Sequence, residues 1–179
     1  MTKYLFFFGL FLLIAGGYLI TQKQQQQSLL PSSVGTTSVL GEQTKTEGCE
    51  AIGPLPDPQC SPGAIFPDAT KDQICKPGYA SSVRNVPQSE KDLVYAEYGI
   101  THHSKGEYEV DHIVSLELGG SNDIANLYPE AAEPKPGFHE KDQVENYLHD
   151  LVCSGKTPLS QAQEVIRTNW VQVYQHMPN

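Results

Sequence analysis

The chain has 179 residues, enough for one folded domain behind an N-terminal segment, and a formal net charge of −9 at pH 7. From Cys60 onward, nine Lys and Arg stand against seventeen Asp and Glu, and no basic stripe occurs. This balance excludes a protein that binds polyanions mainly through clustered cations. No Gly-x-Ser-x-Gly or His-Glu-x-x-His motif occurs, so nothing indicates a serine hydrolase or a zinc protease.

Residues 4–20 are uncharged and mostly apolar, and Lys3 and Lys23 flank them. A helix of this length spans about 25 Å at about 1.5 Å per residue, close to the thickness of a hydrocarbon core. We therefore expect residues 1–23 to be a single-pass membrane anchor, with the rest of the chain outside the cytoplasm. The alternative is a signal peptide cleaved near residues 15–17, which would leave a secreted protein.

Residues 24–48 are rich in Gln, Ser, Thr and Gly and carry few long apolar side chains. Such a segment buries too little surface to offset the entropy lost on ordering, so we expect a flexible, disordered linker. Residues 49–179 are then expected to form the folded domain.

The sequence contains four cysteines, Cys49, Cys60, Cys75 and Cys153. They suit two disulfides in an exported chain, whereas the lack of Cys-x-x-Cys spacing disfavours a zinc site. Spacing alone leaves all three pairings open. Of these we expect Cys49 with Cys60, around a Pro-rich loop, and Cys75 with Cys153, between an early loop and a late helix.

In the first half of the domain, residues 54–70 are rich in Pro, Gly and Asp and are expected to be irregular. Ser89 and Asp92 have the spacing of a capping box, which predicts a short helix that runs to Tyr98. Residues 107–116 begin with alternating polar and apolar side chains and then turn apolar, as expected for a half-buried strand.

In the second half, residues 119–122 predict a turn, and residues 124–128 lead into a second strand. Residues 139–152 and 160–174 both place apolar side chains at helical spacing, which predicts two amphipathic helices. Together these elements predict an α+β domain.

The adjacent residues Asp111 and His112 are the most informative feature of this domain. They lie near the end of the predicted strand and precede the turn, so a hard oxygen ligand is next to an imidazole. Metal-assisted hydrolysis of a phosphodiester needs such a pair, because the metal binds oxygen ligands and a proton acceptor activates water.

The block around this pair resembles the HNH endonucleases, also called ββα-metal or His-Me finger enzymes. The matching positions are Asp111, His112, Ile113, Leu116, Gly119, Gly120, Asn122, Asp123, Asn126, Leu127, His139, Lys141 and Asp142. Flanking segments are similar to those of small extracytoplasmic HNH-like proteins, namely residues 60–63, 78–79, 83–87 and 141–155. The resemblance covers residues 60–170, nearly all of the expected domain.

Two positions depart from the pattern of that family. No cysteine lies between Cys75 and Cys153, which excludes the zinc knuckle that many HNH modules carry there. His139 follows Asn126 by 13 residues, a longer gap than in the compact motif, across a segment with Pro134 and Pro136.

The resemblance implies a small ββα-metal finger core with flanking helices and disulfides. It also implies that Asp111 and His139 hold one divalent cation, that His112 activates water, and that Asn126 orients His112. Asp142, one helical turn after His139, is an alternative ligand. Mg²⁺ or Mn²⁺ is favoured with a carboxylate ligand, and Zn²⁺ or Ni²⁺ is also compatible with Asp and His.

Arg84 is a candidate for binding a phosphate oxygen through its guanidinium group, with a surface ion pair as the alternative. The expected function is an exported or membrane-anchored metal-dependent endonuclease with nucleic acid as substrate, DNA being favoured. The alternative is a non-catalytic extracytoplasmic HNH-shaped binding module, which the acidic charge favours.

Overall fold

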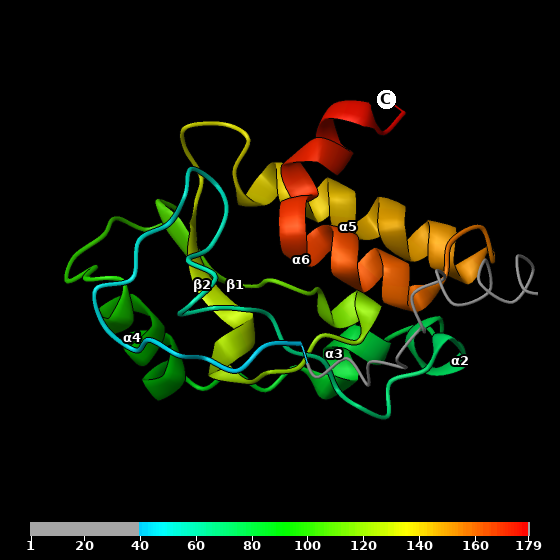
Figure 1. Ribbon diagram of the computed structural model, residues 1–179, viewed down its shortest axis with the longest axis horizontal. Helices are drawn as coiled ribbons and strands as arrows, with labels where there is room; N and C mark the ends of the chain where they lie inside the picture. Colours follow the sequence, from blue (N-terminus) through cyan, green and yellow to red (C-terminus); the bar gives the residue numbers. More distant parts are fainter. Residues whose placement is uncertain (1–39, 179) are drawn as a thin grey trace, which may run out of the picture. The chain divides into compact units, whose positions relative to one another are not determined.

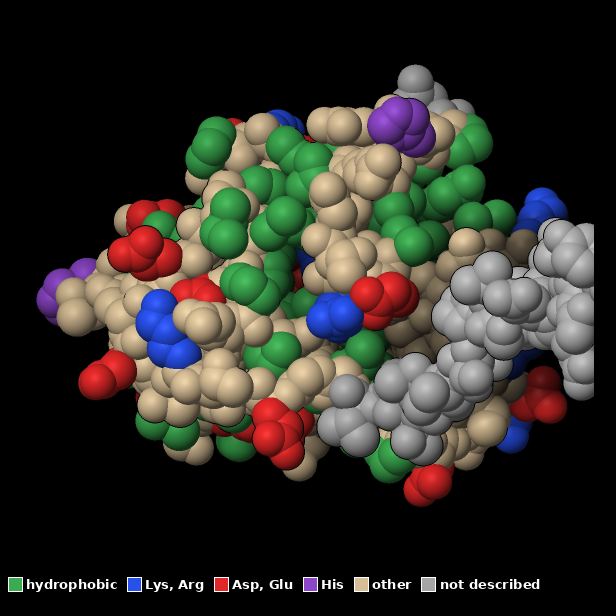
Figure 2. Space-filling view, in the orientation of Figure 1, with side chains coloured by type: hydrophobic (Ala, Val, Ile, Leu, Met, Phe, Trp, Pro, Cys, Tyr) green, Lys and Arg blue, Asp and Glu red, His purple; other side chains and the backbone are tan. Residues whose placement is uncertain are grey.

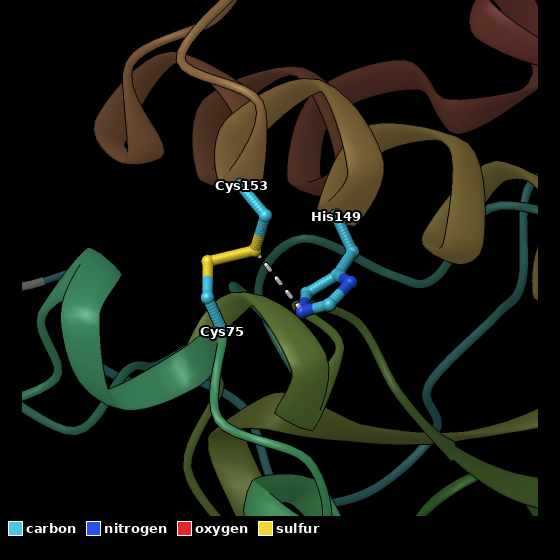
Figure 3. A group of neighbouring side chains, drawn as sticks. All are labelled: Cys75, His149 and Cys153. Carbon is cyan, nitrogen blue, oxygen red and sulfur yellow. Dashed lines mark hydrogen bonds between the residues drawn. A yellow bond between two sulfur atoms is a disulfide. The ribbon is translucent and has the colours of Figure 1, made fainter.

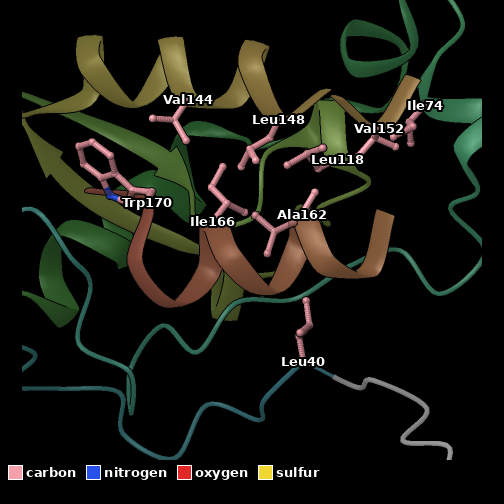
Figure 4. Packing of buried hydrophobic residues seen from close by; sticks show 10 residues of the cluster. Leu40, Ile74, Leu118, Val144, Leu148, Val152, Ala162, Ile166 and Trp170 are labelled. Carbon is pink, nitrogen blue, oxygen red and sulfur yellow. The ribbon is translucent and has the colours of Figure 1, made fainter. Parts of the chain in front are cut away.

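Two C-terminal helices carry most of the apolar core. The structure, a computed structural model, describes residues 40–178. Helix α5 (Phe138–Cys153) and helix α6 (Leu159–His176) lie side by side (Figure 1). Their buried apolar residues meet between them (Figure 4), namely Val144, Leu148, Val152, Ala162, Ile166 and Trp170. Both helices were predicted from their apolar spacing, and both predictions are confirmed.

The segment before the first cysteine packs on the domain. Leu40 is buried in the same core as the two helices (Figure 4), and Lys45 forms a 3.0 Å ion pair with Asp57. The prediction of a disordered linker up to residue 48 is therefore wrong for residues 40–48, because Leu40 has apolar partners. The predicted anchor or signal peptide, residues 1–23, and residues 24–39 lie outside the described residues. Within residues 40–178, no helix is both long and apolar enough to cross a membrane.

Strands β1 (Tyr108–His112) and β2 (Leu127–Ala131) form an antiparallel two-stranded sheet. His112 at the end of β1 lies opposite Leu127 at the start of β2. The first strand is shorter than predicted, because the apolar residues that follow His112 turn into the loop between the strands. The α+β class is confirmed.

Helix α4 (Gln88–Glu97) packs against this sheet through Val94, which joins Val110 and Leu127 in a second apolar cluster. The helix was predicted, but its start was not. It begins after Pro87, which offers no side-chain cap, so the predicted capping box at Ser89 is wrong.

Residues 113–126 connect the strands through two 3-10 turns, η1 (Leu116–Leu118) and η2 (Ile124–Asn126). A Cβ atom at Gly120 would lie 1.7 Å from the carbonyl oxygen of Val114, so only glycine fits there. The loop is therefore folded tightly back on the end of β1.

The two short helices α2 (Lys71–Ile74) and α3 (Tyr79–Val83) were not predicted, because each is about one turn long. The predicted disulfides, Cys49–Cys60 and Cys75–Cys153, are both present. The second one joins the end of α2 to the end of α5, across 78 residues of sequence.

Candidate active site

Asp111 and His112 are the last two residues of β1, and strand alternation directs their side chains to opposite faces of the sheet. The side chain of Asp111 is 15% exposed, whereas His112 is only 2% exposed. The His112 imidazole is therefore in the interior, whereas the Asp111 carboxylate is partly exposed and lies next to α5.

A buried lysine near the start of α5 contacts the Asp111 carboxylate. Nζ of Lys141 donates to Oδ2 of Asp111 at 2.6 Å, to the carbonyl oxygen of His112 at 2.8 Å and to Oε1 of Glu145 at 2.5 Å. The Ser115 hydroxyl donates to the other carboxylate oxygen of Glu145 at 2.9 Å. All three ammonium protons are therefore used, and Lys141 ties the end of β1 to α5.

The charges in this network stabilise one another. Burial lowers the pKa of Lys141, but the carboxylates of Asp111 and Glu145 raise it by more, so Lys141 stays protonated. Burial raises the pKa of Asp111, but the Lys141 charge and the hydrogen bonds to the Asp111 carboxylate together outweigh it, so this pKa is lowered and the carboxylate is ionised. Burial raises the pKa of Glu145 to about 7, against the opposing effect of Lys141.

His112 is held by Asn122, whose amide is itself fixed in orientation. Nε2 of His112 lies 3.3 Å from Oδ1 of Asn122, whose Nδ2 donates to the Val83 carbonyl at 2.7 Å. An amide oxygen only accepts hydrogen bonds, so Nε2 carries the ring proton and Nδ1 keeps its lone pair. Burial lowers the pKa of His112 from 6.5 to about 4, which leaves the imidazole neutral at physiological pH.

Asn126 is fully buried and serves the loop that follows β1. Its Nδ2 donates to the carbonyl oxygens of Val114 at 3.0 Å and Ser121 at 2.8 Å. Its Oδ1 accepts from the backbone N–H groups of Ala64 at 3.1 Å and Val114 at 2.9 Å. None of these four bonds reaches the His112 ring. The expected orienting contact is instead made by Asn122, while Asn126 fixes the backbone beside the histidine.

His139 is the second residue of α5 and Asp142 lies one helical turn later, and both are exposed. The His139 ring packs on Phe138, with ring centroids 4.3 Å apart. Asp142 lies within the electrostatic reach of Asp111, because burial and then the Asp111 charge raise the pKa of Asp142. No group of three metal-ligating side chains within residues 40–178 includes Asp111, so the structure does not bring Asp111, His139 and Asp142 together as a ligand set.

Arg84 follows α3 directly and is exposed. Its charge contributes to lowering the pKa of His112, where burial is the larger cause. It also opposes the upward pKa shifts that burial and neighbouring carboxylates produce at Glu109 and Asp142. Arg84 is therefore a solvent-accessible cation near the acidic residues Glu109 and Asp142.

Glu130 on β2 is a second buried acid near this site. It is 1% exposed, and neither carboxyl oxygen has a hydrogen-bond partner. Burial raises its pKa to about 10 in spite of the Lys141 charge, so the Glu130 carboxyl is neutral. Asp111 thus stays ionised beside a protonated neighbour.

Within residues 40–178, one group of three side chains has metal-ligating atoms that all lie within 4.8 Å of one another, namely Cys75, His149 and Cys153 (Figure 3). Both sulfurs belong to a disulfide, so this group could hold a metal only after reduction. A cation beside Asp111 would have one or two protein ligands and otherwise water, which is typical of Mg²⁺. Asp111 has lone pairs left for such a bond, because each carboxylate oxygen makes one protein contact.

The described surface, like the sequence, has no cluster of basic side chains on the face that is shown (Figure 2). On the face shown in Figure 2, Lys and Arg side chains lie singly among acidic ones rather than in a stripe. A polyanion approaching the protein would therefore depend on local cations such as Arg84 and on a bound metal.

Three site residues could not be assigned roles from the sequence. Lys141 and Glu145 have the i,i+4 spacing of a helical ion pair, which is most often a solvent-exposed feature. Asn122 is in a turn-like segment, where an amide is usual. Only the fold shows that Lys141 contacts Asp111, that Asn122 contacts His112 and that Glu145 holds Lys141 in place.

The chain shows no significant similarity to a known family model, to a curated protein sequence or to a solved structure. Function is therefore inferred from the chemistry and arrangement of these residues.

Proposed function

We propose that the protein is a metal-dependent endonuclease that hydrolyses phosphodiester bonds of nucleic acid, with DNA as the favoured substrate. The observation that carries the proposal is the neutral imidazole of His112, held by Asn122 one residue from the ionised carboxylate of Asp111. The chain order of β1, connecting loop, β2 and α5 is compatible with a ββα-metal finger.

His112 is the proton acceptor in this proposal. Its Nδ1 lone pair takes a proton from the attacking water, while Nε2–H stays bonded to the Asn122 oxygen. Asn122 thereby keeps the ring in one tautomer, and the Lys141 bond to the His112 carbonyl fixes the backbone that carries it.

Asp111 supplies the oxygen ligand for one divalent cation, with His139 or Asp142 as the second protein ligand. The cation, Mg²⁺ or Mn²⁺ in preference to Zn²⁺ or Ni²⁺, would polarise the phosphoryl oxygen and stabilise the leaving oxygen. Arg84 offers a guanidinium for a nonbridging phosphate oxygen of the substrate.

The proposal includes export. Two disulfides suit an oxidising compartment outside the cytoplasm, and the apolar N-terminal run suits a single-pass anchor or, as the alternative, a cleaved signal peptide. The domain would then meet extracellular or periplasmic nucleic acid.

A second candidate function is a non-catalytic binding module with the same fold. Two observations favour it: the net charge of −9, and the use of one Asp111 oxygen by Lys141. In such a module the Asp111–Lys141 pair would serve folding alone.

Cleavage of supercoiled plasmid and of RNA by the oxidised full chain in detergent tests these two functions. Reactions contain Mg²⁺, Mn²⁺, Zn²⁺ or a chelator at low salt. We expect metal-dependent cleavage that falls by about 100-fold or more in His112→Ala, the usual contribution of a general base. His102→Ala, a change at an exposed loop histidine, is the matched control and should cleave normally.

Cleavage that is equal in wild type and His112→Ala would assign the activity to another base or to a contaminant. A folded sample that cleaves nothing with any metal would favour the binding module.

A further inference from the structure

The disulfide between α2 and α5 has an imidazole beside it. His149 lies one helical turn before Cys153 on α5, and its ring points toward the disulfide (Figure 3). Nε2 of His149 is 3.4 Å from Sγ of Cys153 and 3.2 Å from the carbonyl oxygen of Ile74. The ring nitrogen is thus between a sulfur and a backbone acceptor.

The spacing of these atoms is that of a metal site. With Zn–S of about 2.3 Å and Zn–N of about 2.0 Å, sulfur and nitrogen on adjacent corners of a tetrahedron are about 3.5 Å apart. The observed distance between Nε2 of His149 and Sγ of Cys153 is 3.4 Å. On the same geometry two thiolates would lie about 3.8 Å apart, so the sulfurs need only separate by roughly 1.7 Å once their bond is broken.

The group is accessible from solvent. Cys75 and His149 line a cavity of about 490 Å³ together with Tyr79 and Glu117. Cys153 lines a separate hollow together with Tyr147 and Asp150. A reductant and a metal ion can therefore reach the sulfurs without unfolding of the core.

We propose that reduction of the Cys75–Cys153 disulfide creates a binding site for Zn²⁺ or a similar thiophilic divalent ion. The ligands are the two thiolates and His149, with the fourth position open to water from the cavity. Its three ligands are not among the proposed catalytic or metal-binding residues of the endonuclease, although Arg84 lines the same cavity.

The reaction balances with a dithiol as the reductant. The dithiol gives two electrons and two protons to the S–S bond and becomes a disulfide itself, while Cys75 and Cys153 become thiols. Metal binding then displaces the two thiol protons. His149 moves its ring proton from Nε2 to Nδ1, which frees the Nε2 lone pair and gives up the bond to the Ile74 carbonyl.

The consequence is that the link between α2 and α5 survives a change of redox state. In the oxidised chain a covalent bond makes this link, and in the reduced chain a metal ion does so. Cys75 and Cys153 make the link in both states, and His149 joins them in the reduced one.

Cobalt titration of the reduced full chain in detergent tests this site. A Cys49→Ser/Cys60→Ser background removes the other pair of thiols and leaves Cys75–Cys153 as the remaining disulfide. After reduction with dithiothreitol and its removal under inert gas, we expect one Co²⁺ per chain, with thiolate-to-cobalt charge transfer and tetrahedral d–d absorption. Zn²⁺ should displace it.

In the same background, His149→Ala should weaken Co²⁺ binding by roughly tenfold or more and shift the d–d bands, since one of the three protein ligands is lost. His102→Ala is the control and should bind normally. Circular dichroism during the titration monitors folding, because a chain that loosens on reduction should regain structure as it binds metal. The proposal is overturned by a reduced chain without charge-transfer absorption, folded or unfolded, or by an oxidised chain that absorbs equally.

Discussion

Nζ of Lys141 lies 2.6 Å from Oδ2 of Asp111, and the lysine side chain is fully buried. The same ammonium holds the carbonyl oxygen of His112, so one residue of α5 fixes both members of the motif at the end of β1. A buried ammonium is tolerable only with its partners present, because its desolvation is costly. The geometry of the candidate site therefore depends on a residue that the proposed chemistry does not use directly.

Lys141→Met should destabilise the domain by about 3–5 kcal/mol, because it leaves the carboxylates of Asp111 and Glu145 buried without their cation. Urea unfolding followed by circular dichroism measures the loss. Lys156→Met, a change at an exposed lysine, is the control and should stay within about 0.5 kcal/mol of wild type. A Lys141→Met protein as stable as this control would contradict the network.

Substitution of Asn126 should mainly lower stability, whereas substitution of Asn122 should mainly lower the cleavage rate. Asn126→Ala leaves three buried and one part-buried backbone group without these partners and should cost about 3 kcal/mol or more in unfolding free energy. Asn122 is half-buried, so Asn122→Ala should cost less stability while it lowers the cleavage rate by freeing the His112 ring. The reverse pattern, with Asn122→Ala fully active, would show that His112 needs no orienting amide.

Glu130→Gln should stabilise the protein at neutral pH. The folded pKa of Glu130 is raised to about 10 from 4.5, so the fold favours the protonated form and stability is lost as pH rises between these values. A neutral amide avoids this loss. Glu130→Gln should therefore be about 3 kcal/mol more stable than wild type at pH 7 and no more stable at pH 4.5 or below.

Urea unfolding of Glu130→Gln at pH 5 and pH 8 measures this difference. Glu133→Gln changes an exposed glutamate three residues further along the chain. It is the control and should show no gain in stability. Equal pH dependence in wild type and Glu130→Gln would mean that Glu130 is ionised in the folded protein.

The pH profile of the cleavage reaction should fall only at low pH, with an acid-side midpoint near pH 4. His112 has a folded pKa lowered to about 4 from 6.5, chiefly by burial, so the neutral base persists well below pH 6. The same shift means that its contribution to stability is present above pH 6.5 and lost as pH falls through about 4. kcat/KM measured from pH 4 to pH 8 should fall to half near pH 4, and a midpoint near 6.5 would show that the ring is solvated in the active state.

The sequence predicted the parts of the fold that periodic patterns encode. Helices α5 and α6 and strand β1 follow from apolar spacing, whereas the disulfide pairing was one of three that the spacing left open. The burial of Lys141 could not be predicted, because it depends on acids contributed by β1 and α5 together. The choice of Asn122 over Asn126 as the His112 partner also depends on the path of the loop, which brings Asn122 against Val83 of α3.

The proposed function requires that Asp111 holds the metal and that His112 activates water. Plasmid cleavage rate against Mn²⁺ concentration, for wild type, Asp111→Asn and His112→Ala, tests it most directly. Asp111→Asn should raise the Mn²⁺ concentration for half-maximal rate by roughly tenfold or more, since the carboxylate that binds the metal is lost. His112→Ala should lower the maximal rate at an unchanged half-maximal concentration. Two variants with the same Mn²⁺ dependence as wild type and undiminished rates would contradict the account.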